Sequence, residues 1–283
     1  MLKKLQKNLT YSSHTPVLLQ EACDLLSVTP EGRYIDATYG GGGHSNEIIR
    51  RGCLVLAFDQ DAEAIAAASK IEGLTLVKSN FTHLQEVVKV QNWTPVAGVL
   101  FDLGLSSHHI DAGYRGFSFQ KEAPLDMRMD LDLPVSAGTL VNTLPAEALV
   151  SLLKDFGEIP VAKMLVERMI AARPIETTLD LSKVSGQWAR QVFQALRIAV
   201  NDELGAITQT LPQALSVLAP GGRIAVITFH SLEDRIIKDY FNEWEEQGLV
   251  KILTDKPIIP SDSEITNNSR SKSAKLRGVE KIK

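Results

Sequence analysis

Short apolar runs alternate with segments of helical periodicity in the first part of the chain. The runs are rich in β-branched residues and predict strands over Arg33–Thr38, Cys53–Asp59, Leu74–Asn80 and Val96–Leu103. The segments between them predict helices over His44–Arg51, Ala62–Lys70 and Thr82–Val90. Strands separated by helices of this length form βαβ units, so the pattern predicts an α/β fold whose parallel sheet is buried on both faces.

The alternation stops near Asp111, and no clear strand pattern follows before Gln187. Helices are predicted over Pro145–Phe156 and Pro160–Ala172, each with a proline near its first turn, where a missing N–H costs nothing. A strand pattern returns at Arg223–Phe229. We therefore expect a sheet domain that is interrupted by a helical insertion.

The expected domain boundaries follow from this interruption. The sheet domain comprises residues 1–110 and 191–283, and the insertion comprises residues 111–190. At the start of the second part, apolar residues recur at helical spacing and predict one long amphipathic helix: Phe193, Leu196, Val200, Leu204 and Ile207. The tail from about Pro260 is polar and is predicted to be mobile.

Composition excludes several classes of protein. The chain is 44% hydrophobic and 23% charged, which is typical of a globular protein. Its formal net charge of −4 argues against a strongly basic protein that wraps nucleic acid, but local basic patches remain possible. Apolar stretches are far shorter than the ~20 residues that cross a bilayer, and Met1–Thr10 lacks the apolar core of a secretory signal. We expect a cytoplasmic protein in which Cys23 and Cys53 are reduced thiols.

Four glycines, Gly40–Gly43, join the first predicted strand to the first predicted helix. Glycine lets the backbone approach a ligand closely. The run does not fit the dinucleotide fingerprint G-x-G-x-x-G, because Ser45 stands where the third glycine belongs. Asp36 would repel a pyrophosphate but suits a ligand with ammonium and sulfonium groups, such as S-adenosylmethionine (SAM). A cap of a helix or loop is the alternative role for Asp36.

Two residues at strand ends are candidates for contacts to a nucleoside. Asp59 ends the second predicted strand, where an acidic group can accept the hydroxyls of a ribose. Asp61, two residues later, is expected to cap the next helix instead. Phe81 follows the third strand, and it is either a flat wall against adenine or an ordinary core aromatic.

Asp102 and His230 are the candidate catalytic residues. Asp102 ends the fourth predicted strand, beyond which open α/β sheets bind their ligands. An acceptor there can hold an exocyclic amine such as that of cytosine and aim its lone pair at a methyl carbon, and positioning supplies much of the catalysis of such an in-line transfer. A structural or cofactor contact is the alternative for Asp102. His230 also ends a strand, although a lone histidine is often structural.

We expect no metal site, because the adjacent His108 and His109 have no third ligand at a suitable spacing.

Several blocks of sequence are distinctive, and they follow one another in order from about residue 14 to residue 277. They are His14–Glu21, Asp36–His44, Asp102–Ser107, Arg115–Phe119, Pro124–Asp130, Phe193–Leu204, Ala219–Arg223, Phe229–Arg235 and Ser273–Arg277. In these blocks the chain resembles the bacterial family of ribosomal RNA small subunit methyltransferase H.

The resemblance implies a Rossmann-like SAM-dependent methyltransferase sheet with an inserted helical domain that binds the rRNA substrate. It implies methylation of N4 of a cytidine in the decoding region of 16S rRNA, within the small ribosomal subunit. No DNA and no membrane are expected as partners, and the choice between a monomer and a homodimer stays open. By resemblance, the SAM contacts fall on Gly42, Gly43, His44, Asp59, Phe81, Asp102 and His109.

One region departs from the family pattern. Asp180–Arg190 is short, and Gln187–Gln191 stands where the family has His-Pro-Ala-Thr-Arg. This change bears on rRNA docking more than on SAM binding. The candidate phosphate contacts are basic residues of the insertion and its flanks together with the basic tail: Arg115, Arg128, Arg190, Arg197 and residues 270–283.

Two other functions are compatible with parts of this pattern. A nicotinamide-dependent dehydrogenase would use the same kind of sheet, but the glycine spacing and Asp36 argue against it. A SAM-binding module that has lost turnover and binds nucleic acid is the second alternative, and only the short segment near residue 180 favours it.

Overall fold

The computed structural model describes residues 16–105 and 113–283. The chain divides into two compact units. Unit 1 comprises Met1–Ser107 and Ala206–Lys283, and unit 2 comprises His108–Gly205. The discontinuous division was expected, but its second boundary is later than the predicted one at residue 190, because helix α10 packs on the helices of unit 2.

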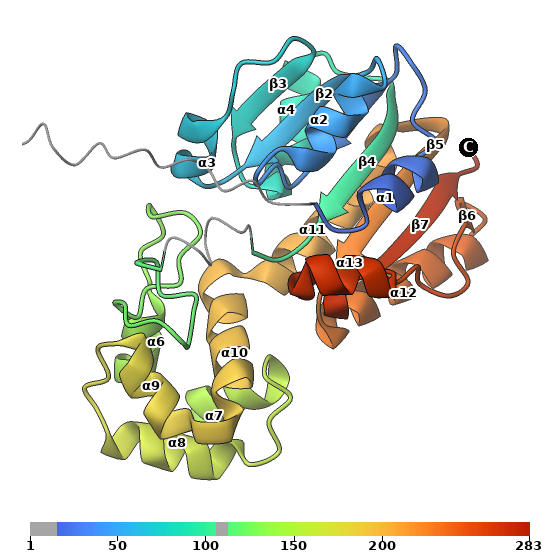
Figure 1. Cartoon of the computed structure of the whole chain (residues 1–283). Helices are drawn as coiled ribbons and strands as arrows, with labels where there is room; N and C mark the ends of the chain where they lie inside the picture. Colours follow the sequence, from blue (N-terminus) through green and yellow to red (C-terminus); the bar gives the residue numbers. More distant parts are fainter. Residues whose placement is uncertain (1–15, 106–112) are drawn as a thin grey trace, which may run out of the picture. The chain divides into compact units, whose positions relative to one another are not determined.

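The described residues of unit 1 form one seven-stranded sheet with the strand order β3-β2-β1-β4-β5-β7-β6 (Figure 1). The strands are β1 (Arg33–Asp36), β2 (Leu54–Asp59), β3 (Leu74–Lys78), β4 (Val96–Asp102), β5 (Leu218–Thr228), β6 (Val250–Ile252) and β7 (Lys275–Lys281). Strands β1 to β5 are parallel, whereas β7 runs antiparallel to both β5 and β6. The first four strands confirm the sequence prediction to within a few residues.

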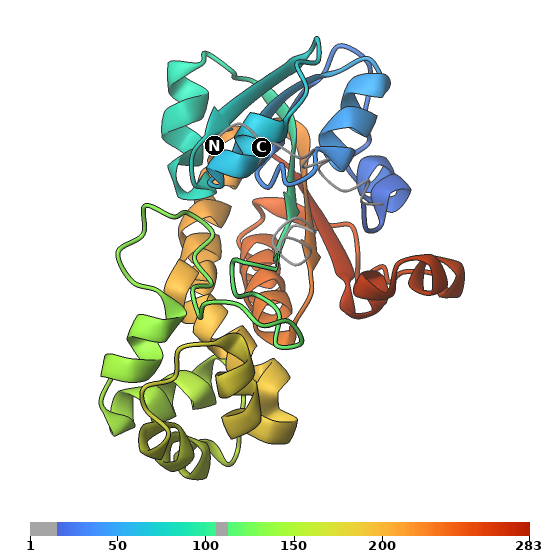
Figure 2. The ribbon, with the colours of Figure 1, turned by 60° about the vertical axis from the view of Figure 1, so that its left-hand side comes forward.

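Helices cover both faces of this sheet (Figures 1 and 2). On one face, α1 (Leu19–Leu25) and α2 (Gly43–Arg50) pack with the strands in a single apolar cluster. On the other face lie α4 (Leu84–Val90), α11 (Glu203–Val217) and α12 (Ser231–Glu246), and α11 is hydrogen-bonded to each of its neighbours. The short α3 (Ala62–Ala67) follows β2, and the 3₁₀ turn η1 (Phe81–His83) leads into α4. Burial on both faces explains the continuous apolar runs of the strands.

Unit 2 is helical, as the sequence predicts. Its helices are α6 (Ala137–Thr143), α7 (Ala146–Asp155), α8 (Ala162–Ala171), α9 (Thr178–Ser185) and α10 (Ala189–Asn201). Helix α10 packs against α6, α7 and α9, and its buried face includes Val192, Phe193 and Leu196. Helix α9 has a capping box between Thr177 and Asp180, and the turn η2 (Gly186–Trp188) then leads directly into α10.

The prediction of one long helix through Ile207 is wrong. Helix α10 ends at Asn201, and α11 begins at Glu203. Asp202 between them has a φ of 48°, which is left-handed and cannot continue a right-handed helix. The apolar spacing continued across this break, so periodicity alone could not reveal it.

The prediction of a mobile tail is also wrong. The tail forms α13 (Asp262–Asn267), the turn η3 (Ser269–Ser273) and strand β7, whose Leu276 and Val279 are fully buried. Two of its cations have an acidic partner within unit 1: Lys275 and Arg277 pair with the buried Asp234 of α12 at 2.8 and 2.7 Å. Among the described residues, no helix has both the length and the apolar character to span a membrane.

Candidate functional site

Three neighbouring parallel strands end in an aspartate: β1 at Asp36, β2 at Asp59 and β4 at Asp102. Because β1 pairs with both β2 and β4, these carboxyl groups lie along one edge of the sheet. Ligands of open α/β sheets bind at this edge. The structure therefore places the three predicted acidic residues where a common ligand could contact them.

Asp59 connects two parts of this edge. Its carboxylate accepts the backbone N–H of Gly40 at 2.9 Å and that of Asp61 at 2.8 Å. Burial raises the pKa of Asp59 to about 7 despite these two hydrogen bonds. Asp61 accepts the N–H of Glu63 and caps α3, as the sequence predicts.

Gly42 and Gly43 are required by packing within the protein. Gly42 has a φ of +74°, and a Cβ on it would lie 2.6 Å from the Tyr39 ring. A Cβ on Gly43 would lie 2.1 Å from Pro16. The sequence analysis explained the glycines by the approach of a ligand, but side chains of the chain itself fill the space that their missing Cβ atoms leave.

Asp36 is 1% exposed and has internal partners. It accepts the N–H of Thr38 at 3.1 Å and the hydroxyl of Ser45 at 2.6 Å. Burial raises the pKa of Asp36 in spite of both bonds. Asp36 therefore ties the loop after β1 to α2, which agrees with its alternative role as a loop cap, while its charge still lies close to the sheet edge.

His44 and Asp102 lie beside each other. His44, in the first turn of α2, is 5% exposed, and its Nε2 lies 3.1 Å from the carbonyl oxygen of Val17. Its Nδ1 lies 3.6 Å from Oδ2 of Asp102, which is within ion-pair distance but longer than a hydrogen bond. Burial, followed by the charges of Asp36 and Glu233, raises the pKa of Asp102 to about 8.

The other oxygen of this carboxyl group, Asp102 Oδ1, is buried and has no hydrogen-bond partner among the described residues. Leaving such an oxygen unpaired is costly, and a buried unpaired group in a native protein often marks a functional site. A ligand that donates a hydrogen bond or carries a positive charge would satisfy it. SAM has a sulfonium and an ammonium group, so this set of acidic acceptors fits SAM.

Phe81 begins η1 after β3 and packs edge to face against Phe101, with ring centroids 5.9 Å apart. It is partly exposed. Asn80 fixes the start of this turn, because its side chain accepts the N–H of Thr82. The geometry is consistent with both sequence interpretations, because the ring packs against the buried Phe101 and the residue remains partly accessible.

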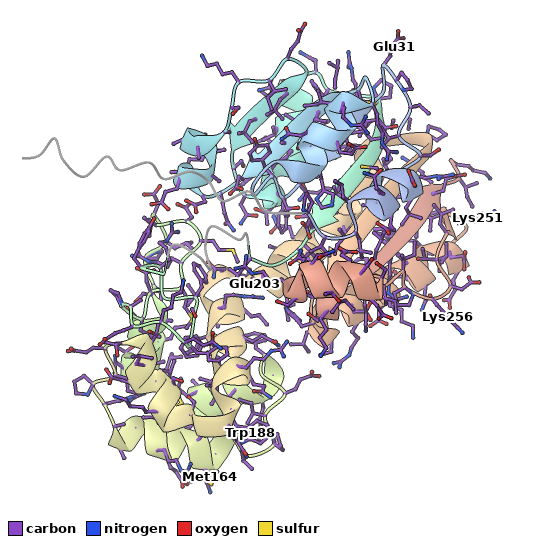
Figure 3. The ribbon with its side chains drawn as sticks, viewed as in Figure 1. Glu31, Met164, Trp188, Glu203, Lys251 and Lys256 are labelled. Carbon is purple, nitrogen blue, oxygen red and sulfur yellow. The ribbon has the colours of Figure 1, made fainter. Side chains whose placement is uncertain are left out.

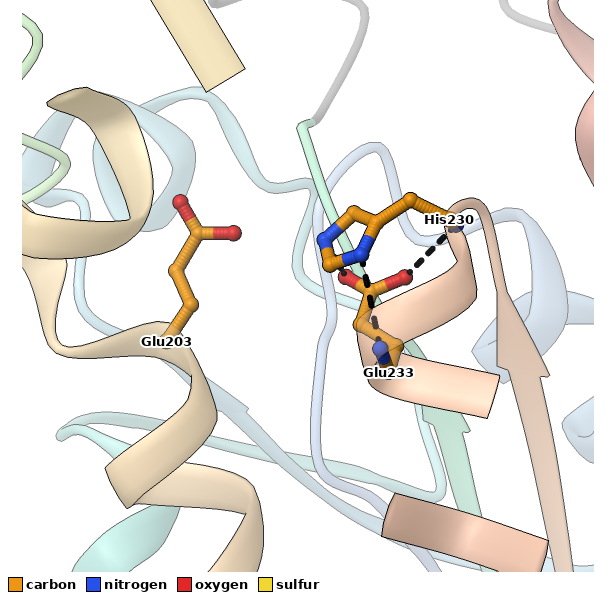
Figure 4. A group of neighbouring side chains, drawn as sticks. All are labelled: Glu203, His230 and Glu233. Atoms are coloured by element: carbon orange, nitrogen blue, oxygen red, sulfur yellow. Dashed lines mark hydrogen bonds and ion pairs between the residues drawn. The ribbon is translucent and has the colours of Figure 1, made fainter. Parts of the chain in front are cut away.

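His230 has a structural role in the described fold. It is the N-cap of α12, where its Nδ1 accepts the N–H of Glu233 at 3.4 Å and its Nε2 lies 3.1 Å from the Glu233 carboxylate (Figure 4). That carboxylate also accepts the backbone N–H groups of Phe229 and His230, which completes a capping box. His109, the remaining predicted contact, lies outside the described residues.

Most arginines that were candidates for phosphate contacts have internal partners. Arg115 is 2% exposed and donates to the carbonyls of Arg128 and Met129. Arg128 makes a bidentate pair with Asp126, and Arg197 makes one with Glu203. These three guanidinium groups stabilise unit 2.

Exposed cations remain in both units. Arg190 of α10 is exposed. In unit 1, Lys251 of β6 and Lys256 after it are exposed and labelled in Figure 3. The sequence analysis did not single out these two lysines, because isolated lysines are common on any surface.

The strand order places one antiparallel strand between β5 and β6, and the carboxyl edge of the sheet is acidic. These two features define a Rossmann-like methyltransferase fold. A family model described as the MraW methylase family matches residues 11–282. The chain therefore belongs to the MraW methylase family. This membership argues against the dehydrogenase alternative.

Curated relatives match over nearly the whole chain. A protein of Heliobacterium modesticaldum named ribosomal RNA small subunit methyltransferase H is 43% identical, and the match covers 95% of this chain and 99% of the relative. A protein of the same name from Symbiobacterium thermophilum is also 43% identical, over 95% of this chain and 96% of the relative. Among solved structures, an rRNA methylase from Streptococcus thermophilus covers 96% of this chain and all of its own, at 12% identity and a TM-score of 0.48.

Proposed function

We propose that this protein transfers a methyl group from SAM to N4 of a cytidine in the decoding region of 16S rRNA. The proposal places this reaction in the cytoplasm, on the small ribosomal subunit. Family membership and the names of the relatives support it, since both describe methylases and the relatives are named for small-subunit rRNA. The observation that carries it is the acidic carboxyl edge with the unpaired Asp102 Oδ1.

When bound, SAM would supply a methyl group on a sulfonium: the bond between sulfur and the methyl carbon would break as the bond to N4 forms, S-adenosylhomocysteine would leave, and N4 would lose one proton to water after the transfer. We assign Asp59 to the ribose hydroxyls and Phe81 to one face of the adenine. Gly42, Gly43 and His44 border the cofactor at the start of α2, and His109 completes the set by resemblance. In this proposal unit 1 holds the cofactor and unit 2 contacts the rRNA.

Asp102 receives the substrate amine in this proposal. The lone pair of cytosine N4 is delocalised into the ring, so the amine is a weak nucleophile. A carboxyl oxygen that accepts one N–H of the amine can hold the remaining lone pair in line with the methyl carbon, and such positioning supplies much of the rate enhancement. The target base must leave its stack to reach this position. In this proposal His230 has two roles. It fixes the start of α12 at the same end of the sheet, and it makes the substrate contact predicted from the sequence.

The test uses small subunits from a strain that lacks this modification. Incubated with the purified protein and tritiated SAM, they should become labelled, and mass spectrometry of the digested rRNA should show N4-methylcytidine at one position. Absence of label, with SAM binding intact, would reject the catalytic proposal. In the Asp102→Ala variant, loss of methyl transfer with retained rRNA affinity supports catalysis, whereas unchanged methyl transfer would exclude the assigned role of Asp102.

A further inference from the structure

Glu264 of α13 reaches the start of α1, from the opposite end of the sequence. Its Oε1 accepts the backbone N–H of Leu18 at 2.8 Å, across a separation of 246 residues. Leu18 is the N-cap of α1 and makes no side-chain cap of its own. Glu264 therefore provides, from the C-terminal part of the chain, the hydrogen-bond acceptor for the backbone N–H of the residue that precedes α1.

This contact holds a strained segment. Leu18 is 1% exposed and has a left-handed φ of 52°. A β-carbon disfavours that conformation, so surrounding contacts must maintain it. Without Glu264 the Leu18 N–H would be a buried donor that has lost its acceptor. The segment would then lower its free energy by moving to a less strained backbone conformation.

The residue before Leu18 contacts the candidate site. The carbonyl oxygen of Val17 lies 3.1 Å from Nε2 of His44. A carbonyl oxygen can only accept, so Nε2 of His44 donates and carries the proton. In the neutral ring Nδ1 then presents its lone pair, and this is the nitrogen that faces Asp102. Pro16, one residue earlier, packs on Gly43.

We propose that Glu264 is a positioning residue of the cofactor site: by holding the Leu18 amide it fixes the Val17 carbonyl, which in turn fixes the ring and tautomer of His44 beside Asp102. The inference rests on the proposed function, because it assumes that His44 and Asp102 border bound SAM. It assigns a role in the site to a helix whose residues carry no predicted chemistry.

Calorimetric titration with S-adenosylhomocysteine tests this role. In Glu264→Leu the acceptor is lost, and we expect binding to weaken about tenfold. Glu264→Gln keeps a side-chain oxygen and should bind within about threefold of the unchanged protein. If Glu264→Leu does not fold, Glu264→Asp replaces it, because the shorter side chain keeps the charge but withdraws the oxygen from Leu18.

A matched control lies on α12. Glu245 Oε1 accepts the backbone N–H of Ile252 at 2.7 Å, which is also a bond from a backbone N–H to a glutamate side chain, although more exposed, at a place away from the carboxyl edge. Glu245→Leu should leave the affinity within about twofold. Equal loss of affinity in the Glu245 and Glu264 variants would mean a general effect on stability and would overturn the proposal.

Histidine side-chain NMR gives a readout that is independent of the cofactor. The His44 signals, identified by their absence in His44→Gln, should show a proton on Nε2 in the unchanged protein and in Glu264→Gln. In Glu264→Leu we expect a mixture of tautomers. An unchanged His44 spectrum in Glu264→Leu would overturn the proposal. Failure of the unchanged protein to bind S-adenosylhomocysteine would refute the proposed function instead, and the histidine spectra would still decide the role of Glu264.

Discussion

The carboxylate of Asp59 at the end of β2 accepts the backbone N–H of Gly40 in the loop after β1, at 2.9 Å. A residue assigned to a ribose thus also fixes the glycine loop beside it. Removing the charge of Asp59 should therefore affect both the binding of the ligand and the conformation of the loop.

Asp59→Asn should weaken binding of S-adenosylhomocysteine at least about tenfold, because the amide group would turn a donor toward the N–H of Gly40 or Asp61. Calorimetric titration measures this. Asp61→Asn is the matched control, since asparagine caps helices about as well as aspartate. Equal affinities of the two variants would contradict the role of Asp59.

Gly42→Ala should destabilise the protein more than Gly221→Ala. Both glycines have a φ near +75°, but a Cβ at Gly42 meets the Tyr39 ring whereas nothing lies within 4 Å of one at Gly221. The common backbone strain is on the order of 1 kcal/mol, and the clash should add about 1–3 kcal/mol. Urea denaturation of the two variants measures the difference. Adding Tyr39→Ser should recover part of it; no recovery would mean that the ring is not the cause.

Stability should fall as the pH rises from about 4 to 9. The folded-state pKa values of Asp59 and Asp102, about 7 and about 8, lie above the ordinary value of 3.8. The folded state then holds more protons than the unfolded state, so their contribution is fully present below pH 4 and is lost as the pH passes through 7 and 8. For Asp102 the main cause of the raised pKa is burial, and the charges of Asp36 and Glu233 add to it; His44 also faces this carboxyl group, with Nδ1 3.6 Å from Oδ2.

Asp102→Asn should remove part of this dependence. We compare the free energy of unfolding of this variant with that of the unchanged protein at pH 5 and at pH 9. The difference between them should shift in favour of the variant by at least about 1 kcal/mol at the higher pH. Urea titrations at both values measure it. A constant difference between the two proteins would show that Asp102 titrates normally.

Arg277→Met should destabilise unit 1 by about 1–2 kcal/mol, because the buried Asp234 would lose its closest partner and keep only the half-exposed Lys275. Adding Asp234→Leu should restore part of the stability, since the buried charge that has lost its arginine is then removed as well. Chemical denaturation of the two variants gives both values. A double variant less stable than Arg277→Met would show that the pair does not act as a unit.

Arg115→Ala and Arg190→Ala should separate folding from RNA binding. The Arg115 guanidinium holds two backbone carbonyls inside unit 2, so its loss should cost about 2–4 kcal/mol of stability. Arg190 is exposed, and its loss should change stability by less than about 0.5 kcal/mol while reducing the salt slope of subunit binding by about 1. An unchanged salt slope would exclude Arg190 as a phosphate contact.

The sequence predicted the strands and their terminal acids well, because burial on both faces imposes continuous apolar runs and the acids follow these runs directly. It could not predict the break at Asp202, since one left-handed residue leaves the apolar period unchanged. It also misjudged the tail, because Arg277 and Lys275 look solvated until Asp234 is known to face them.

Within the site, the residue types were predictable but their supports were not. Gly42 and Gly43 were noticed, yet no local signal pairs them with Tyr39 and Pro16. The contact of Glu264 with Leu18 joins distant parts of the chain and has no sequence signature. Such long-range hydrogen bonds follow from the assembled sheet alone.

The position of β7 between β5 and β6 has a consequence for biosynthesis. A nascent polypeptide that has emerged as far as Thr228 already contains five parallel strands, but the side of β5 that β7 will cover is still an open edge. Such an edge can pair with other polypeptides until residues 275–281 arrive. The sheet can therefore be completed only after β7 has been translated. A chaperone bound to the open edge until then would prevent aggregation.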